Sequence, residues 1–276
     1  MSGAEGKSDK GAGLFAVRSL LFLPASNPRA IAKSHDAGSD LVVLDLEDSV
    51  KPEDKAAARA AALEATVSAW PMPVAIRVNG VGSEWHSLDV DAAAGSGADF
   101  VVVPRATSAQ QVHLIAEAVG KPVLAMIETA AGVLAAGEIA REAAALIAGT
   151  NDLRADLRLP PDATREPISA ALQMIVLAAR AGAIAVFDGV FNGLDDPQGF
   201  LAEAREGRSL GFDGKSLIHP NQIAPCHQAF APDNAEVERA HALVDAFNGG
   251  AERFGNAMIE RMHVEQARRL LQRARS

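Results

Sequence analysis

Short apolar runs alternate with longer stretches of helical character along most of the chain. Eight runs follow this pattern: SLLFLP (19–24), LVVLDLED (41–48), PVAIRVN (73–79), DFVVVPRA (99–106), PVLAMIET (122–129), AALIAGTND (144–152), AIAVFDGV (183–190) and GKSLIHP (214–220). Several are rich in Val, Ile and Leu without alternation, which is typical of strands covered on both faces. Strand–helix–strand order requires parallel pairing through crossovers. Eight such units predict an α/β fold, a closed (β/α)8 TIM barrel over residues 14–224.

Both ends of the chain depart from this pattern. Residues 225–276 contain two helical stretches, DNAEVERAHALVDAF and HVEQARRLLQRA, joined by the loop NGGAERFGNAMIER. No strand remains for these helices to cover, so we expect a helical C-terminal extension that packs on the barrel or on a neighbouring subunit. Residues 1–13 are small, polar and glycine-rich, and this composition predicts a disordered tail.

Composition narrows the classes of partner. The chain has 276 residues, 49% of them hydrophobic, and a formal net charge of -9. A negative body argues against binding nucleic acid or an anionic membrane through bulk electrostatics. The single cysteine, Cys226, excludes an internal disulfide and suits a reducing compartment, so we expect a cytoplasmic protein. No apolar run is long enough to span a bilayer.

The active site of a barrel of this kind lies at the carboxyl ends of the strands. Polar residues follow nearly every apolar run at that end: Asp45, Glu47 and Asp48; Arg77 and Asn79; Arg105; Glu128 and Thr129; Asn151 and Asp152; Asp188; and His219. Loops are polar in general, so one or two such residues would carry little information. Their recurrence at almost every strand end predicts a catalytic mouth.

Glu128 and Asp152 are the most informative pair of carboxylates, because they stand at the ends of adjacent predicted strands. Two carboxylates that face one cavity either share a proton or bind a cation. Oxygen ligands without cysteine or clustered histidine favour Mg²⁺ or Mn²⁺ over zinc. In that case Glu47 and Asp48 hold water around the metal. The alternative for Glu128 is a salt bridge to one of the arginines at the barrel rim.

Each of two arginines, Arg77 and Arg18, has two possible roles. Arg77 ends an apolar strand, where a guanidinium needs a carboxylate partner. It either clamps a substrate carboxylate or forms a fixed ion pair with Glu47 or Asp48. Arg18 has the same two interpretations, but it stands before its strand. A Schiff-base mechanism needs a lysine inside the barrel, and Lys215, at the start of its run, is the one lysine near a strand. The metal route is therefore favoured.

Six motifs in this order resemble one enzyme family. They are RSLLFLPASNPR, LDLEDSV, IRVNG, IETAAGV, GTNDL and LGFDGKSLIHPNQI. The set resembles the HpcH/HpaI aldolase and citrate lyase beta-subunit superfamily, from about Arg18 to the C-terminus. Within it the chain is most similar to the citrate lyase beta-like branch, which includes malyl-CoA and citramalyl-CoA lyases and a malyl-CoA thioesterase.

The resemblance implies a set of roles. It implies Mg²⁺ on Glu128 and Asp152, Arg77 on the carboxylate of an oxoacid, and Glu47 and Asp48 supporting metal-bound water. It also implies a homotrimer or hexamer in which the extension of one subunit caps the mouth of its neighbour. Many relatives carry GKMID there, with the aspartate as catalytic acid or base. This chain has GNAMIER, so Glu260 stands at that place.

The function implied is Mg²⁺-dependent cleavage of a 3-hydroxyacyl-CoA thioester, of malyl-, citramalyl- or citryl-CoA type, into a 2-oxoacid and an acyl thioester. In this retro-Claisen reaction the metal and Arg18 or Arg77 stabilise the oxygens that gain charge. Three alternatives stay open: a malyl-CoA thioesterase on the same site, a metal-dependent aldolase on a free hydroxy-oxoacid, and a citrate lyase beta subunit that needs a carrier protein. CoA as part of the substrate rests on the resemblance alone.

Overall fold

The computed structural model describes residues 11–274 and divides the chain into two compact units, 1–229 and 230–276. Most of the predicted disordered tail, residues 1–10, lies outside the described residues. The short 3-10 helix η1 (Ala12–Ala16) begins inside that predicted tail, and its Leu14 is buried.

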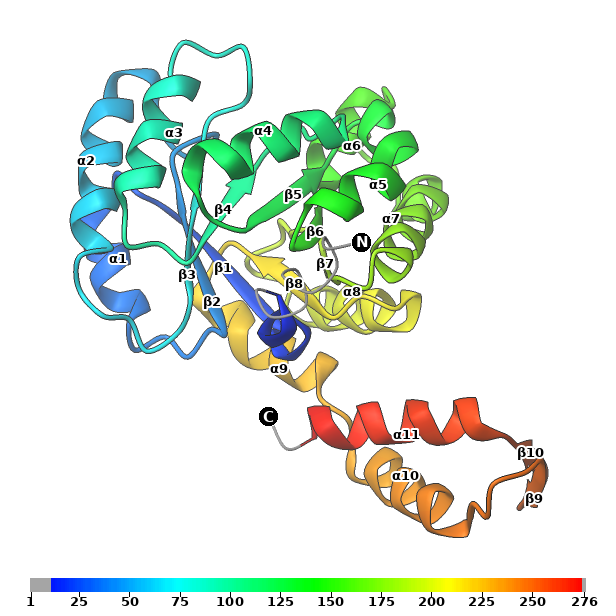
Figure 1. Cartoon of the computed structure of the whole chain (residues 1–276). Coiled ribbons are helices and arrows are strands. Elements are labelled where there is room, and N and C mark those ends of the chain that lie inside the picture. Colours follow the sequence, from blue (N-terminus) through cyan, green and yellow to red (C-terminus); the bar gives the residue numbers. More distant parts are fainter. Residues whose placement is uncertain (1–10, 275–276) are drawn as a thin grey trace. The chain divides into compact units, whose positions relative to one another are not determined.

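The first unit is a closed barrel of parallel strands in chain order, as Figure 1 shows. The strands are β1 (Ser19–Pro24), β2 (Leu41–Asp45), β3 (Val74–Arg77), β4 (Phe100–Val103), β5 (Val123–Ile127), β6 (Ala145–Ala148), β7 (Ala185–Asp188) and β8 (Gly214–Leu217). Each lies within the apolar run predicted for it, and β8 pairs with β1 to close the barrel. The predicted (β/α)8 TIM barrel is confirmed.

Helices follow the strands along the chain, and most of them cover the outside of the barrel. They are α1 (Pro28–Ser34), α2 (Lys55–Ala65), α3 (His86–Gly95), α4 (Ala109–Val119), α5 (Ala130–Glu142), α6 (Thr150–Asp156), α7 (Ser169–Ala181), α8 (Pro197–Leu210) and α9 (Ile223–Phe230), with 3-10 turns η2 (Pro52–Asp54), η3 (Glu166–Ile168) and η4 (Pro220–Gln222). Several of these helices are capped at the N-terminus by a side chain that accepts a backbone N–H. Asn27, Thr129 and Asp196 are examples. Such a cap contributes about 1 kcal/mol and fixes where each loop at the mouth ends.

Alternation along the strands decides which side chains enter the barrel. The inner core contains every second residue of the strands, such as Leu41 and Val43 in β2, Ala75 in β3, Leu124 and Met126 in β5, and Ala185 and Phe187 in β7. Because side chains alternate in a strand, Asp45, Arg77 and Glu128 continue the inward set at the mouth. Asp188 follows the inward Phe187 and therefore points out of the barrel.

The second unit contains α10 (Asn234–Ala246), β9 (Glu252–Phe254), β10 (Ala257–Ile259) and α11 (Arg261–Arg273). The segment predicted as a loop between the helices is a two-stranded antiparallel hairpin, in which Phe254 pairs with Ala257. Gly255 has φ 58 in its two-residue turn, as tight hairpins require. Packing of this extension on the barrel or on a neighbouring subunit stays a prediction.

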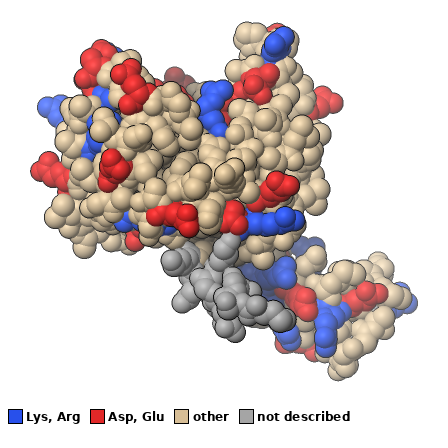
Figure 2. Space-filling view, turned by 45° about the horizontal axis from the view of Figure 1, so that its top comes forward, with Lys and Arg blue, Asp and Glu red and all other residues tan. Residues whose placement is uncertain are grey.

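On the face of the barrel shown in Figure 2, acidic and basic side chains are interspersed among uncharged ones. Within residues 11–274, every helix is too short or too polar to cross a lipid bilayer. A strong concentration of charge is instead found inside the mouth of the barrel.

Candidate active site

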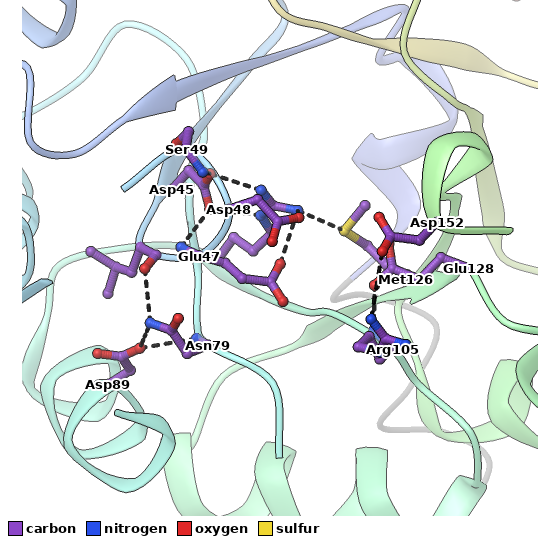
Figure 3. A network of polar contacts seen from close by, with 12 residues as sticks. Asp45, Glu47, Asp48, Ser49, Asn79, Asp89, Arg105, Met126, Glu128 and Asp152 are labelled. Atoms are coloured by element: carbon purple, nitrogen blue, oxygen red, sulfur yellow. Dashed lines mark hydrogen bonds and ion pairs between the residues drawn. The ribbon is translucent and has the colours of Figure 1, made fainter. Parts of the chain in front are cut away.

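A cavity of about 380 Å³ opens at the carboxyl ends of the strands. Six of the polar residues singled out in the sequence line it: Asp45, Asp48, Arg77, Glu128, Asn151 and Asp152. Figure 3 shows two groups of polar side chains at this place, with the segment from Asp45 to Asp48 on one side and Glu128, Asp152 and Arg105 on the other. The structure therefore brings together acids from the end of β2 and the turn after it, from the residue that follows β5, and from the first turn of α6.

Asp45 and Arg77 form a buried, two-pronged ion pair. The Arg77 Nε donates to Asp45 Oδ1 at 2.6 Å, and its Nη2 donates to Oδ2 at 2.7 Å. Burial would raise the pKa of Asp45, but the charge and hydrogen bonds of Arg77, with those from Ser49 and the Glu47 N–H, hold it below its usual value. The guanidinium also lies 5.4 Å from the centre of the Phe22 ring. Arg77 is thus fixed as a permanent cation in the wall of the cavity.

Glu47 and Asp48 complete the surroundings of that guanidinium. The Arg77 Nη1 lies 3.0 Å from Glu47 Oε2 and 3.7 Å from Asp48 Oδ2. Burial raises the pKa of Glu47 to about 8, opposed by Arg77 and reinforced by the charges of Asp48, Glu128 and Asp45. Without a metal, Glu47 is therefore mostly protonated at neutral pH. The two-pronged partner of Arg77 is Asp45, which neither sequence alternative named, while Glu47 takes the single contact that the ion-pair alternative predicted. A role of Arg77 in binding a substrate carboxylate stays a prediction.

A polar network beneath the acidic turn was not foreseen from the sequence. The buried Lys55 Nζ donates to the carbonyls of Leu46 and Glu47 and to Asn79 Oδ1, each at 2.7 Å. Asn79 Nδ2 donates to the Leu46 carbonyl at 2.8 Å and also to Asp89. Lys55 lies on the buried face of α2, so a lysine at an apolar helical position was the available signal.

Glu128 and Asp152 lie together at the other side of the cavity. Glu128 is 2% exposed, and its Oε1 accepts the Arg105 backbone N–H at 2.6 Å. Burial and the charge of Asp152 raise the pKa of Glu128 to about 7, against the effect of that hydrogen bond. The Arg105 side chain instead approaches Asp152, with 3.5 Å between Nη1 and Oδ1. The backbone of Arg105 has φ 48, a strained value that goes with its N–H pointing at Glu128.

Gly149 allows Glu128 its position. A Cβ built on Gly149 would overlap the Cβ and Oε2 of Glu128. The close approach of the β6 end to this carboxylate therefore depends on the missing side chain.

The charge balance of the mouth fits a divalent cation. Among the described residues, no group of three or more His, Cys, Asp or Glu side chains is arranged to hold a metal. Mg²⁺ needs only one or two protein carboxylates, since water or substrate completes its shell. Glu128 is a buried carboxylate with a raised pKa beside a second acid, and an added cation would relieve both its burial and its repulsion.

Arg18 must be removed from the predicted site. It precedes β1, and its Nε donates to Asp40 Oδ2 at 3.1 Å, just before β2. Both residues lie at the amino end of the barrel, opposite the mouth, so the prediction that Arg18 binds substrate or stabilises charge there is wrong. Cys226 donates to the Arg18 carbonyl, and burial raises the pKa of its thiol to about 12, which makes it unreactive.

Asp188 is also displaced from the mouth. It lies between the barrel and α8, where it accepts from Lys215 Nζ at 2.9 Å and from Arg165 Nη2 at 2.6 Å. Lys215 also pairs with Glu203 of α8 at 2.8 Å. Lys215 thus points away from the cavity, as its place early in the run suggested. His219 caps η4 by accepting the Asn221 N–H.

Glu260 belongs to the second unit, between β10 and α11. Its side chain is exposed, and its backbone N–H donates to His263 Nδ1 at 2.9 Å. Its placement at the mouth of a neighbouring subunit stays a prediction.

Comparison with known proteins agrees with this geometry. A sequence model of the family HpcH/HpaI aldolase/citrate lyase matches residues 18–220. A (3S)-malyl-CoA thioesterase of Cereibacter sphaeroides is 38% identical over 272 residues, covering 93% of this chain and 94% of that protein. Citrate lyase subunit beta of Leuconostoc mesenteroides subsp. cremoris is 32% identical, covering 93% of each chain.

Solved structures give the same result. CitE from Mycobacterium tuberculosis, in complex with magnesium, acetoacetate and coenzyme A, has a TM-score of 0.86 and 32% identity, covering 95% of this chain and 100% of that chain. The resemblance seen in the six motifs is confirmed by a match that spans the barrel. The chain belongs to the HpcH/HpaI aldolase/citrate lyase family.

Proposed function

We propose that the protein cleaves the carbon–carbon bond of a short 3-hydroxyacyl-CoA thioester with the help of Mg²⁺, or Mn²⁺, held by Glu128 and Asp152. The observation that carries the proposal is the buried Glu128, its pKa raised to about 7, beside a second acid in the cavity. Support for the ligands comes from the CitE structure in complex with magnesium, acetoacetate and coenzyme A. When bound, the metal would act as a Lewis acid toward the substrate oxygens.

Arg77 would attract the substrate carboxylate electrostatically. Its Nε and Nη2 remain with Asp45, and its Nη1 is shared with Glu47. Because Glu47 is mostly neutral at pH 7, it can release Nη1 to an incoming carboxylate at low cost. Glu47 and Asp48 would also hold water at the rim of the cavity.

The proton balance requires one further carboxylate. We assign it to Glu260 of a neighbouring subunit, in a homotrimer or hexamer. Glu260 would take the proton of the substrate hydroxyl, the adjacent carbon–carbon bond would break, and the electron pair would pass to the thioester as its enolate. The products are a 2-oxoacid and, after the enolate regains a proton, an acyl-CoA.

Hydrolysis of the thioester at the same site is the second candidate. It is favoured by the (3S)-malyl-CoA thioesterase of Cereibacter sphaeroides, which matches 93% of this chain. The two reactions would use the same metal and the same arginine and would differ in the bond that breaks. Lysis of malyl-CoA gives acetyl-CoA and glyoxylate, whereas hydrolysis gives free CoA and malate.

The deciding experiment incubates the purified protein with malyl-, citramalyl- and citryl-CoA and Mg²⁺, with products identified by mass spectrometry. We expect a 2-oxoacid and an acyl-CoA, loss of turnover with EDTA, and loss of turnover in Glu128→Ala but not in the exposed control Glu64→Ala. Undiminished turnover of Glu128→Ala would reject the metal assignment. Turnover only of free hydroxy-oxoacids, or only with a carrier protein, would favour the remaining alternatives.

A further inference from the structure

One buried hydroxyl in the cavity has no hydrogen-bond partner. Among the described residues, six buried polar side-chain atoms form no hydrogen bond: Ser39 Oγ, Glu47 Oε2, Arg59 Nη2, Ser83 Oγ, Arg165 Nε and Ser216 Oγ. Two of them still lie in ion pairs, Glu47 Oε2 with Arg77 and Arg165 Nε with Glu206. Of these six residues, only Ser216 lines the cavity at the mouth. A buried hydroxyl without a partner needs an explanation, because most buried polar groups in folded proteins form at least one hydrogen bond.

The fold places Ser216 on the inner wall of the barrel. Its neighbour Lys215 points outward to Asp188 and Glu203, so alternation turns Ser216 inward. Ser216 pairs in register with Leu20, which belongs to the inner core. Ile218, two residues nearer the mouth, lines the same cavity. Ser216 is 1% exposed and lines the cavity.

The surroundings of Ser216 define what its hydroxyl can meet. Phe22, Met126 and Ala148 also line the cavity and supply apolar surface. A serine hydroxyl can donate one hydrogen bond and accept two. Because no described residue is the hydrogen-bond partner of Ser216 Oγ, a molecule inside the cavity can supply the missing hydrogen bond.

The hydrogen bonds that Arg77 already makes indicate which group of a ligand would need the Ser216 hydroxyl as a donor. Asp45 already occupies the Nε and Nη2 of Arg77, while Nη1 contacts Glu47 and the Met126 sulfur. A carboxylate entering the cavity therefore meets positive charge but few free N–H groups. A second donor would complete its binding, and hydrogen bonds to charged groups are the stronger kind.

The size of the cavity orients the ligand. A volume of about 380 Å³ suits the acyl part of the proposed substrate and not the nucleotide end. The thioester must therefore face outward, and the acyl carboxylate inward. We infer that Ser216 is a specificity-determining residue that donates a hydrogen bond to the carboxylate of the 2-oxoacid portion, an inference that rests on the proposed function.

Calorimetric binding of pyruvate, glyoxylate and oxaloacetate in the presence of Mg²⁺ tests this role without turnover. We expect Ser216→Ala to weaken binding of the oxoacids by about tenfold or more, with CoA binding unchanged. Ser216→Thr keeps the hydroxyl and should recover much of the affinity. Ser83→Ala, which removes an unpartnered hydroxyl outside the cavity, is the matched control and should bind as the wild type does.

Unchanged oxoacid binding in Ser216→Ala would overturn the inference, as would equal losses in oxoacid and CoA binding or no oxoacid binding by the wild-type protein. The result is separable from the proposed reaction. A wild-type protein that binds oxoacids through Ser216 but cleaves no thioester would reject the reaction alone. Thioester cleavage with an unaffected Ser216→Ala variant would reject the inference alone.

Discussion

Replacing Glu128 by glutamine removes a buried negative charge and should stabilise the metal-free protein while it abolishes metal binding. Glu128 is 2% exposed, and its Oε1 accepts the Arg105 N–H, which a glutamine carbonyl can also accept. The side chains are of nearly equal size. The substitution therefore isolates the electrostatic effect of the carboxylate.

The size and sign of this effect follow from the pKa of Glu128. Burial and Asp152 raise it from 4.5 to about 7 in the folded protein. Between these pH values the folded state binds a proton that the unfolded state has lost, so the free energy of unfolding falls as pH rises. Each pH unit in this window is worth about 1.4 kcal/mol, which gives a total of about 3 kcal/mol. Glutamine cannot ionise and avoids this loss.

Urea unfolding in EDTA at pH 5 and pH 8 measures the difference. We expect Glu128→Gln and the wild type to be nearly equal at pH 5, and the variant to be more stable at pH 8 by up to about 3 kcal/mol. Excess Mg²⁺ should stabilise the wild type only, by about 2.7 kcal/mol at a hundredfold excess over Kd. The exposed control Glu64→Gln should follow the wild type. Parallel pH dependences of variant and wild type would refute the reasoning.

Three further substitutions test other parts of the mouth. Lys55→Met leaves two carbonyls and an amide oxygen without their donor. We therefore expect the free energy of unfolding, measured in urea, to fall by about 3 kcal/mol. A loss below about 1 kcal/mol would contradict a stabilising role of Lys55 in this turn. Gly149→Ala should push Glu128 aside and weaken Mn²⁺ binding in calorimetry by about tenfold or more, unlike Gly137→Ala, where a Cβ meets open space. Glu47→Gln should remove the part of the fall in stability of the metal-free protein that continues above the pKa of Glu128 up to about pH 8. An unchanged fall in that range would exclude Glu47 as the titrating group.

The sequence predicted the barrel well because each strand is a continuous apolar run, and apolar runs alternating with helices have few other solutions. It predicted the direction of some side chains at the mouth but not of others. Asp45, Arg77 and Glu128 end strands whose alternation turns them inward, whereas Asp188 follows the inward Phe187. The run AIAVFDGV is apolar on both faces, so its pattern could not reveal which face its acid would join.

The partner of Arg77 depended on a detail that no local pattern gives. Strand β2 ends at Asp45, and the chain then turns, so that Asp45 takes the two-pronged contact and Glu47 a single one. Lys55 of the following helix α2 stabilises this turn by donating hydrogen bonds to two of its carbonyls. The strand pattern could not predict this contact, because Lys55 lies in α2 and not beside a strand.

The arrangement around Arg77 explains why the mouth needs ligands from outside the chain. Its guanidinium is buried with Asp45 and makes the acidic turn compatible with the barrel, but that pair consumes most of its hydrogen-bonding capacity. Among the described residues Glu128 has no such ion pair, because the Arg105 side chain approaches Asp152 instead, and the pKa of Glu128 is raised. A fixed internal pair therefore holds the acids in place and leaves a negative site opposite it. In the proposed function, a divalent cation neutralises that site and allows an anionic acyl group to enter a cavity that would otherwise repel it.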